Sequence, residues 1–239
     1  MGRRSAGGGR SGRRVVRTGS VAWLTLLAAG CAARAASGPP LEDPASAAHD
    51  LAAAAVPSGP ARLSFHWEYS DRRGPTRGEG VGRYNPPDSL RLDLFGVGDA
   101  SMAVALAGDG LRSLGTLENV QLPPAAFLYA TAGLFVPPAS APTRGFRTEQ
   151  GDVLVYDVPN GVERRYVVRG DRLVRVEDVR DGRTLRRLEL SWPDGPARWP
   201  SGAEYRDLVT PSRARWSLDE VTNSDERYPA EIFDLPVRG

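Results

Sequence analysis

The feature that most constrains the fold is a strict alternation of apolar and polar residues early in the chain. Leu63, Phe65, Trp67 and Tyr69 fall on one face of an extended segment, and the residues between them are polar. Residues 88–95 repeat the alternation, with leucine at every second position. Such alternation is typical of β-strands that keep one face out of water. The sequence therefore predicts an antiparallel meander whose apolar face is rich in leucine and aromatic residues.

Strand patterns continue through most of the chain. Further strands are predicted at 78–84, 102–106, 111–117, 153–158, 162–168, 173–180, 185–192, 203–209 and 213–221. Asn160-Gly161 is a strong hairpin signal between two of them. Roughly ten strands at hairpin spacing favour a barrel, a sandwich or one strongly bent sheet. The strands at 162–168 and 173–180 are charged on both faces, so we expect them to be only partly covered.

Two segments are compatible with helices. Asp43 followed by Pro44 is typical of an N-cap and a first helical position, and predicts a short Ala-rich helix over 45–56. The segment 124–136 lies between two proline pairs and is the most apolar helical candidate of the mature chain. Its large apolar residues are Phe127, Leu128, Tyr129, Leu134 and Phe135.

The N-terminus has the organisation of a bacterial secretion signal. The first thirty residues hold six arginines and no acidic residue, and the apolar segment 21–30 is too short to span a bilayer. This segment ends in Leu27-Ala-Ala-Gly-Cys31, which resembles a lipobox, where the cysteine is diacylated. We expect a lipoprotein signal peptide at 1–30, lipidation of Cys31, and a tether with a short helix at 31–60. The alternative is ordinary signal cleavage beside an incidental cysteine.

Composition argues against several other function classes. Without its first thirty residues the chain has 25 arginines, no lysine and 29 acidic residues, whereas nucleic-acid binding asks for a basic face. The single cysteine rules out an internal disulfide and a Cys-based zinc cluster. The sequence shows no change of composition after Ala61, so we expect one domain over 61–239.

No catalytic or metal-binding motif stands out. His49 lies in the predicted N-terminal helix and His66 on the polar side of its strand, and neither has a second ligand at metal spacing. The glycines of Gly78-x-Gly-x-Gly82 lie in a strand that runs into prolines, which excludes a phosphate loop. No Gly-x-Ser-x-Gly motif is present. We expect no catalytic residue, metal or cofactor, although the many carboxylates leave a hydrolase of envelope lipids or glycans as a weaker hypothesis.

Several segments together resemble one family. They are the Phe65-x-Trp-x-Tyr69 strand, Gly78-Glu-Gly-Val-Gly-Arg-Tyr84, Pro87-Asp-Ser-Leu-Arg-Leu-Asp-Leu-Phe95, Trp199-Pro200, and the tail Pro229-x-x-x-Phe233-x-Leu235-Pro236. The set is similar to the bacterial lipoprotein-carrier superfamily of periplasmic carriers and outer-membrane lipoprotein receptors. The resemblance covers nearly all of 61–236 and is most specific in the first meander and the tail.

The resemblance implies a mainly β fold with a few helices. In that superfamily a strongly curved, unclosed antiparallel sheet, or half-barrel, is capped by helices over an apolar cavity that takes acyl chains. The residues expected to line the cavity are Phe65, Trp67, Leu90, Leu92, Leu94, Met102, Val104, Leu106, Leu188, Leu190, Trp192, Trp216 and Leu218. The helix at 124–136, with the five apolar residues named above, is the expected lid.

The leading hypothesis is an outer-membrane lipoprotein that faces the periplasm, binds acyl chains of a lipid or lipoprotein, and takes part in their transfer or insertion without a covalent step. Its expected partners are the lipid or lipoprotein, the membrane through the N-terminal lipid, and a periplasmic carrier, with the protein itself a monomer. The alternative is an envelope scaffold or assembly lipoprotein in which the same residues form a filled core.

Overall fold

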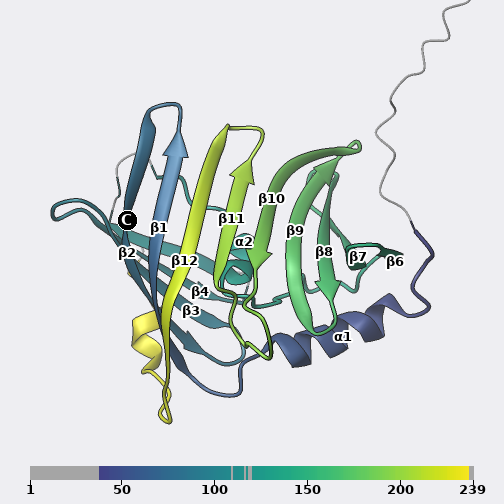
Figure 1. Cartoon of the computed structure of the whole chain (residues 1–239), viewed down its shortest axis with the longest axis horizontal. Helices are drawn as coiled ribbons and strands as arrows, with labels where there is room; N and C mark the ends of the chain where they lie inside the picture. Colours follow the sequence, from purple (N-terminus) through teal and green to yellow (C-terminus); the bar gives the residue numbers. More distant parts are fainter. Residues whose placement is uncertain (1–37, 109, 116, 118–119, 237–239) are drawn as a thin grey trace, which may run out of the picture. The chain divides into compact units, whose positions relative to one another are not determined.

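A computed structural model describes residues 38–108, 110–115, 117 and 120–236. The predicted signal peptide and Cys31 lie outside the described residues. Twelve strands form one antiparallel sheet (Figure 1). They are β1 (Ala61–Asp71), β2 (Gly74–Asn85), β3 (Ser89–Phe95), β4 (Ser101–Ala107), β5 (Gly110–Gly115), β6 (Arg144–Thr148), β7 (Gly151–Val158), β8 (Val162–Arg169), β9 (Arg172–Arg180), β10 (Arg183–Ser191), β11 (Gly202–Asp207) and β12 (Ser212–Asn223).

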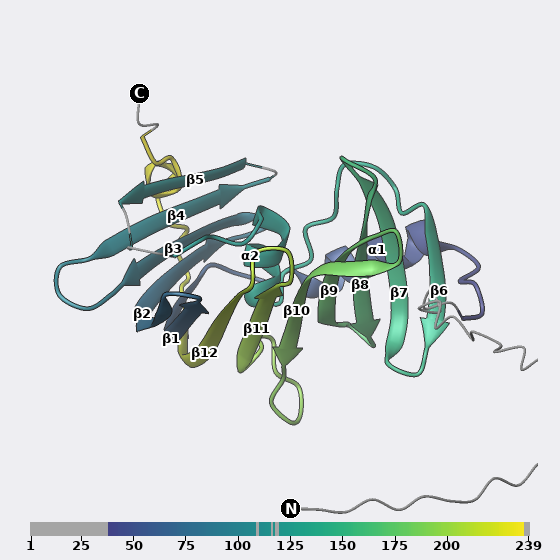
Figure 2. The ribbon, with the colours of Figure 1, turned by 90° about the horizontal axis from the view of Figure 1, so that it is seen from above.

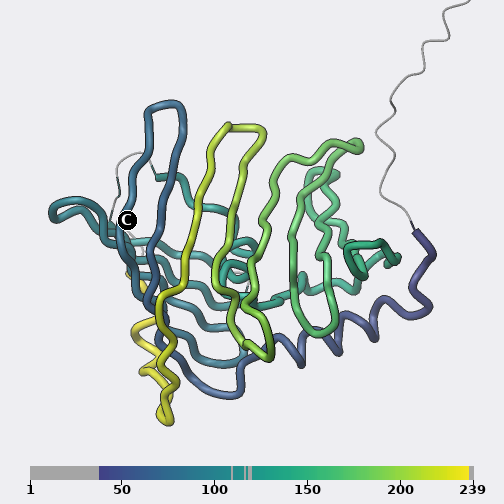
Figure 3. Tube along the Cα trace, in the orientation of Figure 1, coloured from purple at the N-terminus to yellow at the C-terminus, as the bar shows by residue number. Residues whose placement is uncertain are grey.

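The sheet consists of two meanders, which are joined where the last strand pairs with the first. Strands β1 to β5 form one meander and β6 to β12 the other, and β12 pairs with β1 (Figure 3). Strands β5 and β6 are therefore the two edges, and the sheet is not closed. The predicted mainly β fold with an open, half-barrel sheet is confirmed.

The register of β1 and β2 explains the repeated glycines. The apolar residues of β1 alternate onto one buried face, as the sequence predicts, and face the glycines of β2 across the strand pair. A Cβ atom on Gly80 would lie 2.2 Å from the ring of Phe65, and one on Gly78 would lie 2.8 Å from the ring of Trp67. The aromatic rings of β1 thus occupy the space that side chains on β2 would take. The glycines of β2 leave room for the aromatic rings of β1 to pack against the sheet.

Two helices cover the inner face of the sheet, which we define as the face that carries the aromatic residues of β1. Helix α2 (Ala125–Thr131) contacts β9, β10 and β11, inside the curve of the sheet (Figure 2). Helix α1 (Pro44–Ala55) begins with Asp43 as its N-cap and packs on β9. Leu51 of α1 is buried in the core.

The residues before α1 take part in the sheet, although the sequence predicts a tether there. Pro40 forms a β-bridge with Phe146 of the edge strand β6. The Leu41 amide donates to the Gly145 carbonyl at 3.0 Å, which extends this pairing. The N-terminal segment therefore protects the backbone of one sheet edge from water and from other strands.

The C-terminal tail crosses the outer face of the first meander and ends in a short 3₁₀ helix, η1 (Ala230–Phe233), which contacts β3 and β4. Asn85 holds the tail by two hydrogen bonds to the backbone of Tyr228. Arg91 donates to the Ile232 carbonyl at 2.8 Å, and Phe233 is buried. The tail motif that carried part of the family resemblance therefore stabilises the first meander.

Two expectations are corrected by the structure. Strand β6 was not predicted, because its sequence Arg-Gly-Phe-Arg-Thr has no apolar alternation. The helix predicted at 124–136 ends at Thr131, because Gly133 adopts a φ of 74° and its amide bonds to the Ala130 carbonyl. This left-handed conformation is typical of a glycine that terminates a helix. Leu134 and Phe135 therefore follow the helix.

Candidate functional site

The inner face carries two apolar clusters that meet at α2. The first lies over β1 to β4 and includes Leu128 and Tyr129 of α2. The second lies over β7 to β11 and includes Phe127 and Ala130 of α2. Trp216 of β12 packs against both clusters. Helix α2 therefore forms part of the core on both sides.

A small apolar cavity of about 70 Å³ lies between α2 and the strands, lined by residues of both clusters. Seven of the expected cavity residues line it: Phe65, Trp67, Leu92, Leu94, Val104, Leu188 and Trp216. Pockets that hold a small-molecule ligand are typically about 300–1,000 Å³. In this conformation the cavity is too small for a whole acyl chain.

The other expected cavity residues lie on the same face without reaching the cavity. Leu90, Met102 and Leu106 are buried in the first cluster, and Leu218 packs at its border. Leu190 packs at the border of the second cluster. Trp192 follows the end of β10 and donates from its indole to the Leu173 carbonyl at 2.8 Å.

The five expected lid residues are all buried. Phe127 and Phe135 belong to the second cluster, and Leu128, Tyr129 and Leu134 belong to the first. Of these, only Leu128 lines the cavity among the residues that the structure describes. The Tyr129 hydroxyl donates to the Asp88 carbonyl at 2.5 Å and ties α2 to the β2–β3 turn.

Sequence reasoning missed the segment that covers the cavity. Val120, Gln121, Leu122 and Pro123, which we call the strap, lie over it before α2 begins. The strap is neither helix nor strand and has no periodic pattern, so no sequence signal separated it from a loop. Val120 and Leu122 are only partly buried and pack against the first cluster.

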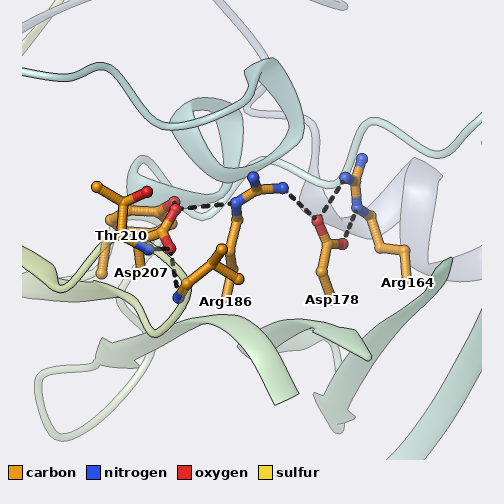
Figure 4. Close-up of polar contacts among 7 residues, drawn as sticks. Arg164, Asp178, Arg186, Asp207 and Thr210 are labelled. Atoms are coloured by element: carbon orange, nitrogen blue, oxygen red, sulfur yellow. Dashed lines mark hydrogen bonds and ion pairs between the residues drawn. The ribbon is translucent and has the colours of Figure 1, made fainter. Parts of the chain in front are cut away.

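A row of ion pairs crosses the inner face of the second meander (Figure 4). Arg164 of β8 forms two hydrogen bonds with Asp178 of β9, at 2.8 and 3.1 Å. Arg186 of β10 lies 3.5 Å from Asp178 and donates to Asp207 of β11 at 3.1 Å. The side chain of Asp178 is only 2% exposed. The row links four strands by charged groups that are poor surroundings for hydrocarbon.

Asp207 ends the row and is held as a carboxylate. It accepts hydrogen bonds from the backbone amides of Val209 and Thr210, both at 2.8 Å. Burial opposes the charged form, but these amides and Arg186 lower the pKa of Asp207 below its usual value. The four charges of the row therefore balance, and none is left over for an anionic ligand.

The outer face has a wider groove of about 820 Å³ across β1, β12, β11 and β10. Its lining is mixed. His66, Glu68, Glu204 and Arg215 are polar or charged, and Trp67, Phe95 and Trp216 are apolar. Burial opposes ionisation of Glu204, but hydrogen bonds from Arg213 and Arg206 lower its pKa to about 2. The groove therefore combines ion pairs with apolar rings, and Trp67 and Trp216 border both the groove and the inner cavity.

No group of three or more His, Cys, Asp or Glu side chains is placed to hold a metal ion within residues 38–236 as described. No helix in the described part of the chain is long and apolar enough to cross a membrane.

Comparison with known proteins identifies the fold. No protein-family model matches the chain, and no curated protein matches it in sequence. A LolA superfamily protein from Nitrosomonas europaea is similar in structure, with a TM-score of 0.52 and 12% identity over 81% of this chain and 98% of that one. A putative outer membrane lipoprotein-sorting protein domain from Vibrio parahaemolyticus has a TM-score of 0.51 and 10% identity over 78% and 94%. The chain therefore has a LolA-type fold.

Proposed function

We propose that this chain is a lipoprotein of the bacterial outer membrane, anchored through Cys31, that binds acyl chains on the inner face of its half-barrel and passes them on without covalent chemistry. The observation that carries the proposal is the apolar cavity of about 70 Å³ beneath the strap, in a LolA-type fold. Burying each CH₂ group contributes about 0.8 kcal/mol, so an acyl chain needs an apolar site to leave a membrane.

The small volume of the cavity corresponds to a closed form in this proposal. Val120 and Leu122 are partly buried and would leave the cavity when a chain enters. The acyl chain would then make the apolar contacts that Val120 and Leu122 give up. Opening of the strap and binding of the chain are therefore coupled. Helix α2 stays in place, because its residues fill both clusters.

Native mass spectrometry of the chain tests acyl binding. We expect the protein, expressed as the full chain with Cys31→Ser and purified without detergent, to carry a lipid that leaves at higher collision energy. A detergent must be avoided, because a bound detergent would stabilise the protein by mass action and displace the lipid. Bare protein alone, with no uptake after incubation with phospholipid vesicles, would contradict acyl binding.

The same measurement addresses a second candidate function. The closed interior and the outer groove of about 820 Å³ also fit an envelope scaffold with a filled core and a partner on its outer face. A scaffold of this kind would show no lipid and no vesicle uptake. The two candidates therefore make opposite predictions for one experiment.

The anchor has its own test. We expect Cys31→Ser to abolish labelling of the protein with radioactive palmitate and to release it from the membrane fraction, because the thiol is the acceptor of the lipid. The unchanged chain, labelled in parallel, is the control. Equal labelling of both proteins would exclude Cys31 as the lipidated residue and leave the acyl-binding proposal to the mass spectrometry above.

A further inference from the structure

Two tryptophans that face each other on β1 and β12 differ in one respect. Trp67 and Trp216 are cross-strand partners, and both line the apolar cavity. The indole N–H of Trp67 donates to the Glu79 carbonyl at 2.9 Å. The indole N–H of Trp216 is buried and has no hydrogen-bond acceptor among the described residues. A buried donor without an acceptor is destabilising and calls for a physical explanation.

The ring of Trp216 is fixed by its stacking. It lies on the ring of Phe65 with centroids 3.7 Å apart and an interplanar angle of 7°. Rotation of the indole toward another acceptor would break this stack and the contacts of Trp216 with both clusters. The N–H group is therefore held in one direction by apolar packing, which is the property of a preorganised donor.

The surroundings favour an acceptor carried by an apolar molecule over a water molecule. The cavity surface is almost wholly carbon, and the Thr131 hydroxyl beside it already donates to the Leu128 carbonyl at 2.7 Å. A buried water is stable where it has about two to four polar partners. Trp216 offers one. A carbonyl oxygen attached to a hydrocarbon chain needs only one donor and fills the apolar space with its chain.

The spaces on the second meander carry charged groups: a pocket of about 450 Å³ is lined by Arg164, Asp178 and Arg186, and one of about 280 Å³ by Asp50, Asp152 and Asp171. The second cluster is filled by an aromatic group in which Phe135 lies 4.8 Å from Tyr166 and Tyr166 lies 5.6 Å from Tyr156, both edge to face. The ion-pair row that includes Asp178 adjoins it, and hydrocarbon against these charges would remove their remaining water. The apolar site for hydrocarbon is therefore the cavity beneath the strap, between β1, β3 and β4 of the first meander and β10 to β12 of the second.

We propose that the indole N–H of Trp216 donates a hydrogen bond to the carbonyl oxygen of an ester- or amide-linked acyl chain, and that the cavity takes one such chain. This inference rests on the acyl-binding function proposed above and adds the ligand class and the recognised atom. The chain runs beneath the strap along the first cluster. A ligand with several acyl chains would keep the others outside this cavity.

Binding of a palmitoyl monoglyceride and of hexadecyl glyceryl ether tests the proposal, because the two have similar chains and only the ester has a carbonyl. The protein is the full chain with Cys31→Ser, purified without detergent, and the affinities come from titration calorimetry. We expect the ester to bind about tenfold more tightly than the ether, the effect of one buried hydrogen bond. Trp216→Phe, which keeps the stack on Phe65, should bind the two equally.

Trp192→Phe is the control, because its indole N–H donates to the Leu173 carbonyl and its ring does not line the cavity. We expect this variant to keep the preference for the ester. Equal binding of ester and ether by the unchanged protein would overturn the role of Trp216 and leave acyl binding intact. An ester preference that persists in folded Trp216→Phe would also overturn it. Binding of neither lipid would overturn this inference together with the proposed function.

Discussion

Replacing Asp178 with asparagine is expected to lower the free energy of unfolding by about 3–5 kcal/mol. Asp178 is 2% exposed and accepts hydrogen bonds from Arg164, and it lies 3.5 Å from Arg186 as well. The neutral amide would leave the Arg164 guanidinium, whose side chain is only 15% exposed, without a counter-ion. Removing one partner of a buried pair costs far more than the pair contributes, because an uncompensated charge remains. Urea-induced unfolding measures the change.

Two controls define this result. Asp152→Asn removes a carboxylate that is 43% exposed and pairs with Arg147, which is 70% exposed, so we expect a loss of only about 0–1 kcal/mol. Arg164→Met combined with Asp178→Leu removes both charges, and should regain much of the loss while Arg186 keeps its pair with Asp207. Equal effects of Asp178→Asn and Asp152→Asn would show that the row is solvated.

The inner face of the first meander could be predicted from the sequence. Alternation over 63–69 and 88–95 placed seven residues of β1 and β3 on one face, because the period of a strand is a local property of the backbone. The tail motif was readable only as part of the family resemblance. Its packing on β3 joins residues 141 positions apart, which no local pattern predicts.

The ion-pair row could not be predicted because it depends on the register of four strands. Arg164, Asp178, Arg186 and Asp207 are far apart in sequence, and charged residues on both faces of β8 and β9 suggested exposure. A register shift in the β8–β9 pairing at Val167/Val168 decides which charges face inward. One residue of slip exchanges the two faces of a strand, so neither composition nor alternation specifies this arrangement.

Whether the helix at 124–136 is a lid or part of the core also could not be predicted from the sequence. Residues 124–136 have an apolar stripe, and a stripe does not distinguish a helix that covers a cavity from one that fills it. The structure places Phe127 and Leu128 in different clusters, so α2 is in contact with apolar side chains on both sides. The strap before it had no pattern at all, although it covers the cavity.

Phe127→Ala and Trp216→Ala should therefore differ in two respects. Phe127→Ala should lower stability more, and Trp216→Ala should weaken lipid uptake more. Phe127 is fully buried, and its ring lies 5.4 Å from that of Tyr205, with the Arg164 guanidinium at 5.4 Å on another side. Truncation leaves a void in packed surroundings, and we expect a loss of about 3–5 kcal/mol in the free energy of unfolding. Because Phe127 does not line the cavity, the variant should still take up acyl lipid at a temperature where it is folded.

Trp216 lines a cavity, so its ring has fewer atoms in contact on that side before any substitution is made. Trp216→Ala should cost about 2 kcal/mol, less than a fully packed tryptophan, and should abolish the ester preference and weaken lipid uptake. Urea unfolding and lipid titration of both variants measure the two effects. A loss of about 3–5 kcal/mol in both variants, with no lipid bound to the unchanged protein, would mean that the inner face is a filled core. That result would contradict acyl binding and favour the scaffold function.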